Sequence, residues 1–274
     1  MSTNADFEYY FARWALTPDG DPIVTDSSLL IPVRRDGALA MLKIAVEAEE
    51  RWGAALMVWW DGIGAARVLE HDENAILLER ATGKSSLIEM AKDGRDDEAS
   101  RIICDVVAKL HAPRGKPLPE LVPLTQWFRA LEPVAAREGG LFVRCAETAR
   151  TLLADPRDTV ALHGDIHHGN ILDFAEQGWL AIDPKRLGGE RGFDYANLFC
   201  NPDYLVATAP GRLARQADVV AQAAKLERKR LLQWILAWAG LSAAWGIEDG
   251  DRESVGPVLQ VAEIAAAELD RSAI

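Results

Sequence analysis

The sequence contains few cysteines, and their placement excludes two kinds of small stabilised domain. Only three occur among 274 residues, and no pair has CxxC spacing. An odd number without that spacing indicates neither a disulfide framework nor a zinc knuckle. The first ten residues, MSTNADFEYY, also lack the basic and apolar segments of a secretion signal. We therefore expect a protein of a reducing compartment, the cytoplasm.

Basic residues are also scarce relative to acidic ones. Lys and Arg total 30 against 42 Asp and Glu, which gives a formal net charge of -12. Such a field repels the phosphate backbone, so we expect no nucleic-acid partner. A cationic small molecule suits this charge better, although an acidic surface also simply keeps a protein soluble. We expect a monomer.

A long uninterrupted apolar run is absent as well. Residues 231–247 are the most apolar stretch, and they follow a basic cluster, KLERKR. The stretch is interrupted by Gln233, Gly240 and Ser242, and it is shorter than the roughly 20 residues that a bilayer demands. We predict a buried core helix here and no membrane partner.

The chain changes character near residue 80. Residues 22–78 show strand-like runs, an Asp36-Gly37 hairpin signal and one helical segment, which together predict a small antiparallel sheet with one helix. After Thr82-Gly83 the apolar spacing is mainly helical. The sequence therefore predicts an α+β protein with two parts, residues 1–80 and 81–274.

The segment richest in chemical groups is HGDIHHGN at residues 163–170, followed by IDP at 182–184. Phosphoryl transfer needs a carboxylate for the proton of the attacking hydroxyl, and oxygen ligands for Mg²⁺. The form HxDxxxxN has the spacing of the protein-kinase catalytic loop. It predicts Asp165 as the catalytic base and Asn170 as a metal ligand, with Asp183 as the second metal ligand.

These strings also carry a family resemblance. HGDxxxxN with a downstream IDP resembles the aminoglycoside phosphotransferase superfamily. The longer strings ALHGDIHHGNIL, GWLAIDPKRLGGERGFDYANLF, WWDGIGAARVL and LSAAWGIEDG are similar to the aminoglycoside and hydroxyurea resistance kinases, which include streptomycin 6-phosphotransferases. The resemblance spans roughly residues 20–250 of this chain.

The resemblance implies a protein-kinase-like two-lobed fold, with a nucleotide-binding lobe at residues 1–80 and a larger, mainly helical catalytic and substrate-binding lobe at residues 81–274. ATP and Mg²⁺ would bind in the cleft between the lobes. The implied activity is phosphorylation of streptomycin at its 6-hydroxyl. Hydroxyurea, an amino alcohol or a sugar are the alternative acceptors.

A kinase-like enzyme also needs a strand lysine and a helix glutamate to place the phosphates. Lys43 lies in the strand-like string AMLKI and fits the first role. Glu47, Glu49 and Glu50 compete for the second. Glu50 shares a helix face with Ala54 and aligns best with the resemblance, so we expect it to hold Lys43.

No GxGxxG motif separates the first strands. The phosphate-covering loop would then be the TDSS string, with Ser27 and Ser28 as contacts, and an ordinary turn is an equally good interpretation. Where the chain passes between the parts, the Glu79 carbonyl and the Ala81 N–H would pair with the adenine edge.

Other residues of these motifs have two interpretations each. For His163 and Asp194 we favour support of the catalytic loop over chemistry or substrate binding, whereas Lys185 suits a γ-phosphate contact and an ordinary surface position equally. The guanidinium groups of streptomycin would suit carboxylates. The candidates are Glu190, Asp203, Glu248 and Asp249.

Two other classes of function compete with a kinase. The histidines and aspartates of the catalytic strings could instead form a metallohydrolase cluster, since imidazole and carboxylate suit Zn²⁺ or Mn²⁺. The metallohydrolase hypothesis assigns no role to Lys43, Glu50 or Asn170. A binding protein that has lost catalysis would be expected to lack one residue of the catalytic set, and this chain keeps them all. The hydrolase ligands would be His163, Asp165, His167, His168 and Asp183.

Overall fold

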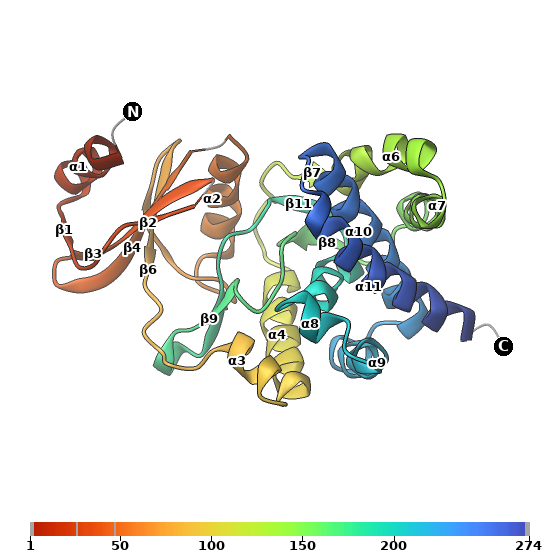
Figure 1. Cartoon of the computed structure of the whole chain (residues 1–274). Helices are drawn as coiled ribbons and strands as arrows, with labels where there is room; N and C mark the ends of the chain where they lie inside the picture. Colours follow the sequence, from red (N-terminus) through yellow and green to blue (C-terminus); the bar gives the residue numbers. More distant parts are fainter. Residues whose placement is uncertain (1–2, 26, 47, 272–274) are drawn as a thin grey trace.

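The computed structural model describes residues 3–25, 27–46 and 48–271, with the main chain alone at residues 3–5 and 48–52. A sheet with the helices Thr3–Trp14 and Ala48–Trp60 forms one end of the molecule, and a group of helices forms the other (Figure 1). We call these the sheet region (residues 3–79) and the helical region (residues 87–271). The chain is thus α+β, in agreement with the prediction from the sequence.

The sheet region is antiparallel, with strand order β1-β3-β4-β6-β5, and β2 pairs with β3. Asp36 and Gly37, both at positive φ, make the turn between β3 and β4 as their Asp-Gly sequence predicts. The bounds are β1 Leu16–Pro18, β2 Ile23–Val24, β3 Ser28–Arg35, β4 Ala38–Ala45, β5 Val68–His71 and β6 Ala75–Glu79.

Alternation along β4 decides which way Lys43 points. Ala40, Leu42 and Ile44 are buried in a core on one face of the sheet. Because successive side chains of a strand point to opposite faces, Lys43 projects from the other face, toward the helical region. Its partner across β6 is Ile76, which belongs to the core of the helical region.

Helix α1 (Thr3–Trp14) packs on the face of the sheet opposite to the one from which Lys43 projects. This helix was not predicted from the sequence. Phe7, Tyr10 and Trp14 are buried against the strands. They lie three and four residues apart, which places them on one side of a helix. The signal was therefore present, although polar neighbours interrupt it.

Helix α2 (Ala48–Trp60) joins the two regions. Its residues Leu56, Met57 and Trp60 are buried in the same core cluster as the helical region. The loop after it also contacts that region, since the Ala66 N–H donates to the Ala181 carbonyl at 2.9 Å. The sequence changes character near residue 80, but one hydrophobic core contains residues from both sides of that position.

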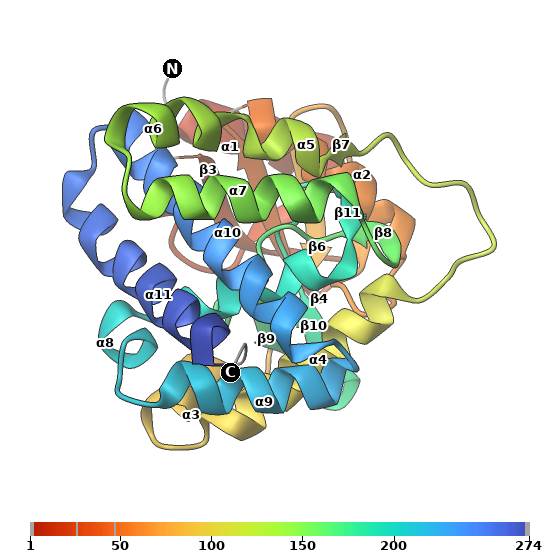
Figure 2. The same cartoon turned by 90° about the vertical axis from the view of Figure 1, so that its right-hand side faces the viewer.

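The helical region is built around α10 (Arg228–Glu248), which packs against α11 (Arg252–Arg271) and α7 (Leu141–Ala154), as Figure 2 shows. Its apolar stretch is buried, which confirms the predicted core helix. Within the described residues, no helix combines the length and the apolar character that a membrane crossing needs.

The other helices of this region are α3 Leu87–Lys92, α4 Asp96–His111, α5 Leu124–Trp127, α6 Leu131–Glu138, α8 Tyr204–Ala207 and α9 Arg212–Ala224. Four short 3₁₀ helices accompany them: η1 Phe128–Ala130, η2 Ala175–Gln177, η3 Arg191–Tyr195 and η4 Asn197–Cys200. Two small sheets hold the segment with the catalytic motif. They consist of β7 Val122–Pro123, β11 Leu187–Glu190 and β8 Thr159–Leu162 in one, and β9 Ile171–Asp173 with β10 Trp179–Ala181 in the other.

Candidate active site

The motif residue Asp165 lies in the loop between β8 and β9, and two amides hold its carboxylate. The Nδ2 of Asn197 donates to Oδ1 at 2.7 Å, and the Nδ2 of Asn170 donates to Oδ2 at 3.2 Å. Asn170 also donates to the Asp165 carbonyl at 2.9 Å. The Asp165 side chain keeps 28% of its surface exposed. It is thus a fixed carboxylate that a substrate can reach.

A buried carboxylate, Asp194, holds the main chain of this loop. It accepts hydrogen bonds from the N–H groups of His163 and Gly164 at 2.9 and 2.7 Å. Its Oδ2 also lies 2.7 Å from the Nε2 of His111. The Asp194 side chain has no exposed surface, so it braces the loop and is closed to substrate.

His163 also supports the loop. Its Nδ1 accepts the Asp165 N–H at 3.2 Å, so its proton resides on Nε2, which donates to the Ile182 carbonyl at 2.8 Å. Burial lowers the pKa of this imidazole, against the nearby aspartates that raise it. A neutral ring with both nitrogens engaged links the loop to the segment that carries Asp183.

Lys43 and Asp183 meet across the two regions. The Nζ of Lys43 forms an ion pair with Oδ1 of Asp183. Asp183 has a φ of 65°, an uncommon conformation outside glycine, and functional sites are where such backbone strain gathers. The Ile182 N–H donates to the Asn170 carbonyl at 2.9 Å. Lys43, Asp165, Asn170 and Asp183 thus belong to one connected site.

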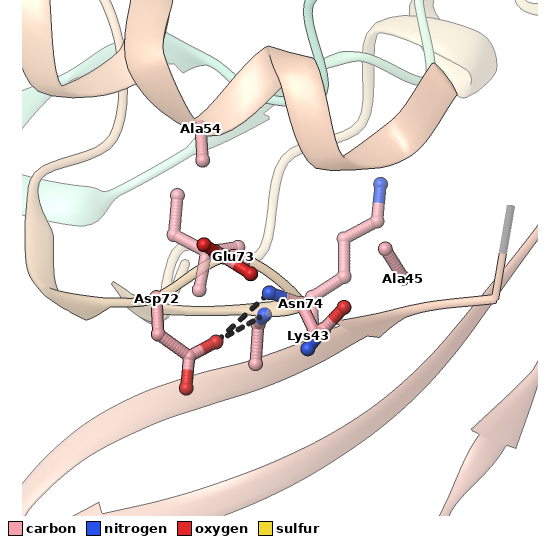
Figure 3. A pocket seen from close by; sticks show the side chains of 8 residues that line it. Lys43, Ala45, Ala54, Asp72, Glu73 and Asn74 are labelled. Atoms are coloured by element: carbon pink, nitrogen blue, oxygen red, sulfur yellow. Dashed lines mark hydrogen bonds between the residues drawn. The ribbon is translucent and has the colours of Figure 1, made fainter. Parts of the chain in front are cut away.

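The surroundings of Lys43 are shown in Figure 3. The side chain rises from β4 toward α2, beside a small hollow that Ala54 and Asn74 also line. The Asp72 carboxylate accepts the N–H groups of Asn74 and Ala75, both at 2.9 Å, and so shapes the loop at the edge of this hollow.

The close approach of α2 to the Asp183 segment requires Gly53. A Cβ at this position would lie 2.5 Å from the Pro184 carbonyl oxygen, which is closer than real Cβ contacts come. The sequence alone gives no signal for Gly53, because Pro184 lies far from it along the chain. Only a glycine lets α2 pack this closely against the segment that carries Asp183.

The predicted partner of Lys43 lies outside the residues whose side chains are described. Glu47 is not described at all, and for Glu49 and Glu50 the main chain alone places them in the first turn of α2. The assignment of Glu50 as the residue that holds Lys43 therefore stays a prediction.

The predicted phosphate loop is a turn between β2 and β3. Asp26, in its middle, lies outside the described residues. Thr25 Oγ1 accepts the Ser28 N–H and donates to the Ser28 carbonyl, both at 3.0 Å. Ser28 is buried, and its hydroxyl has no hydrogen-bond partner among the described residues. In this arrangement Ser27 is the more accessible of the two predicted contacts.

Glu79 and Ala81 lie where the chain leaves the sheet region, as expected. The Glu79 carboxylate accepts hydrogen bonds from the Arg67 N–H at 2.7 Å and from Gln177 Nε2 at 2.9 Å. The side chain therefore ties this crossing to neighbouring loops. The roles predicted for the Glu79 carbonyl and the Ala81 N–H in binding adenine stay predictions.

Two of the carboxylates considered for the substrate are already engaged. Glu190 is buried, and it accepts hydrogen bonds from Arg230 at 2.6 Å and from Trp234 Nε1 at 2.8 Å. Asp203 caps α8 and forms an ion pair with Lys92 at 3.2 Å. Glu190 is thus an internal structural group, whereas Asp203 keeps 42% of its side-chain surface exposed.

The geometry does not favour a metallohydrolase cluster. His163 has no nitrogen left for a metal, and His168 is buried near Asp96, at 4.0 Å from its Oδ1. Among residues 3–25, 27–46 and 48–271, no group of three or more His, Cys, Asp or Glu side chains is placed to hold a metal ion.

The donor set does fit Mg²⁺ as a kinase uses it. Mg²⁺ prefers oxygen ligands and binds through one or two protein carboxylates together with substrate phosphates. The amide NH₂ of Asn170 donates to Asp165, so the Oδ1 of Asn170 is the atom that can bind a cation. Asp183 supplies a carboxylate with 35% of its surface exposed.

Comparison with solved structures defines the fold class. An aminoglycoside phosphotransferase, APH(4)-Ia, solved with ADP and hygromycin B, matches with a TM-score of 0.68 at 13% identity, covering 94% of this chain and 97% of that one. The ethanolamine kinase of Plasmodium vivax matches with a TM-score of 0.64 at 12% identity, covering 94% and 84%. The fold is therefore the two-lobed, protein-kinase-like fold that the motifs predicted.

Comparison of sequences then gives the family. Residues 13–250 match the family described as aminoglycoside/hydroxyurea antibiotic resistance kinase. The streptomycin 3''-kinase of Klebsiella pneumoniae is 50% identical, covering 93% of this chain and 97% of that protein. The streptomycin 6-kinase of Streptomyces griseus is 34% identical, covering 93% and 86%. The chain belongs to this family, and it is an ATP-dependent phosphotransferase.

Proposed function

We propose that this protein phosphorylates streptomycin and thereby confers resistance to it. The observation that carries the proposal is the single site formed by Asp165, Asn170, Asp183 and Lys43, which supplies every group that phosphoryl transfer to a hydroxyl needs. In this proposal the nucleotide binds to residues 1–80, and residues 81–274 supply the base and the acceptor site.

Each residue has one task in the reaction. Asp165 orients the acceptor hydroxyl and takes its proton as the oxygen attacks the γ-phosphorus, while the bond from that phosphorus to the β–γ bridging oxygen breaks and ADP leaves. Lys43 neutralises charge on the triphosphate, and Glu50 steadies Lys43. Asn170 and Asp183 would hold Mg²⁺, which when bound neutralises the developing charge on the phosphates. Catalysis is then mainly placement and charge compensation.

The relatives differ in the hydroxyl of streptomycin that their names give as the acceptor. The motif resemblance implies the 6-hydroxyl, and two relatives at 34% and 33% identity are streptomycin 6-kinases. The relative at 50% identity is a streptomycin 3''-kinase. Because that identity is the higher, we propose the 3''-hydroxyl as the acceptor to test first, with the 6-hydroxyl as the other outcome.

The test is a screen of the purified protein with ATP and Mg²⁺ against streptomycin, other aminoglycosides, hydroxyurea, amino alcohols and sugars. We expect streptomycin to be consumed with stoichiometric formation of ADP. ³¹P–¹H correlation in the product identifies the phosphorylated carbon. Asp165→Asn should lower kcat by about 10²- to 10⁴-fold while ADP binding is kept.

Hydroxyurea is the second candidate acceptor, since a hydroxyurea phosphotransferase of Kitasatospora aureofaciens is 31% identical over 95% of this chain. Turnover of hydroxyurea with inert streptomycin would overturn the proposed substrate and keep the phosphotransferase. ATP consumption that persists unchanged in Asp165→Asn would overturn the proposed mechanism.

A further inference from the structure

Asn197 makes the shorter of the two amide contacts to Asp165, and the roles assigned above do not use it. Its Nδ2 lies 2.7 Å from Oδ1 of Asp165, and only 6% of its surface is exposed. We propose that Asn197, itself oriented by Asn201, is a positioning residue that fixes the Asp165 carboxylate for attack. This inference rests on the proposed function of Asp165.

The local backbone explains why Asn197 faces the loop. Asp194 lies in η3 and Asn197 begins η4, three residues later. In 3₁₀ geometry there are three residues per turn, so side chains three apart lie on the same side. The same side therefore holds the main chain of the loop through Asp194 and the carboxylate of Asp165 through Asn197.

Asn201 determines which end of the Asn197 amide faces Asp165. Its Nδ2 donates to Asn197 Oδ1 at 2.9 Å and to the Asn197 carbonyl at 3.0 Å. Since an amide oxygen only accepts and an amide nitrogen only donates, this occupies the oxygen and leaves the nitrogen for Asp165. Without Asn201, a rotated amide would place an oxygen against the carboxylate.

The consequence for Asp165 is a carboxylate held at both oxygens. Asn197 holds Oδ1 and Asn170 holds Oδ2, so rotation of the group would break a hydrogen bond at each end. The lone pairs that remain then point in a fixed direction for the proton of the acceptor hydroxyl. Misplacement of such a group by about 1 Å costs up to about 10²-fold in rate.

Four variants test this arrangement by kinetics. Asn197→Asp keeps the volume of the side chain but replaces the donor with a second carboxylate, so we expect a loss in kcat of about 10²-fold or more. Asn197→Ala should lose about 30-fold and Asn201→Ala about 5-fold. The double variant should be no slower than Asn197→Ala, because Asn201 acts through Asn197. ADP affinity should stay within about twofold in all four.

A matched control separates positioning from loss of stability. Gln216 is a buried amide between α4 and α9 that donates to Ser100 Oγ at 3.2 Å, away from the site. Gln216→Ala should lower the melting temperature without lowering kcat. If Asn197→Asp keeps wild-type kcat, or if the losses at Asn197 and Asn201 multiply in the double variant, the positioning role is overturned.

A measurement without turnover keeps this inference separate from the proposed function. In protein labelled with ¹³C at aspartate carboxyls, the Asp165 signal is identified by its loss in Asp165→Asn. At one fixed pH, loss of the Asn197 donor changes the hydrogen bonding of this carboxylate, so the signal should shift in Asn197→Ala by more than it does in the control Gln216→Ala. An Asp165 signal that stays in place in Asn197→Ala overturns the inference, whereas a shifted signal with no turnover on any acceptor overturns only the proposed function.

Discussion

Gly53→Ala sets two physical effects on α2 against each other. Glycine inside a helix costs about 1 kcal/mol relative to alanine, so propensity alone predicts a more stable protein. The added Cβ, however, would lie 2.5 Å from the Pro184 carbonyl oxygen, and ordinary contact begins at 3.4 Å. The helix or the Asp183 segment must therefore move by about 0.9 Å, at an overpacking cost of about 1–3 kcal/mol.

The net expectation is a protein less stable by up to about 2 kcal/mol, which lowers the melting temperature by up to about 6 °C for a chain of this size. The same displacement separates α2 from Asp183, so kcat/KM for ATP should fall by about 10- to 100-fold. Differential scanning calorimetry and steady-state kinetics measure the two effects.

Ala55→Gly is the matched control, because Ala55 is exposed on the same helix. It should cost about 1 kcal/mol of stability by propensity and leave kcat/KM unchanged. A Gly53→Ala protein that is more stable than wild type and fully active would refute the argument that this close approach places α2 against the site.

Two further substitutions test buried side chains in the catalytic loop and beside it. Burial lowers the pKa of His168 to about 4 from its ordinary 6.5, so the unfolded chain binds more protons between these values and stability falls as pH drops through this window. Between pH 6.5 and 5, the free energy of unfolding of His168→Gln should therefore fall by about 2 kcal/mol less than that of wild type, as measured by urea titrations at each pH. If the free energy of unfolding falls equally with pH in both proteins, the buried imidazole is not responsible. Asp194→Ala leaves the N–H groups of His163 and Gly164 without their acceptor. We therefore expect kcat to fall by at least about 10²-fold and the loop amides to exchange their hydrogens faster. Unchanged hydrogen exchange would contradict the bracing role of Asp194.

The site was predicted from the sequence where its groups lie close together along the chain. Asp165 and Asn170 share one loop, and Asp183 follows after a short hairpin, so spacing alone indicated the chemistry. Lys43 was predicted because it lies in the strand-like string AMLKI, where a kinase-like enzyme needs a lysine. Asn197 was missed although it lies in the quoted string FDYAN, since only its contact at 2.7 Å to Asp165 distinguishes it from a capping or core amide.

Local sequence determined the β3–β4 hairpin, the buried helix α10 and the catalytic loop, because turn chemistry, apolar period and motif spacing act over a few residues. The tertiary structure decided what depends on residues far apart: the ion pair of Lys43 with Asp183, the packing of Gly53 on Pro184, and the hold of Asn197 on Asp165. Such contacts have no period in the sequence. They arise only when separate elements are packed together, and packing selects the one residue that fits each approach.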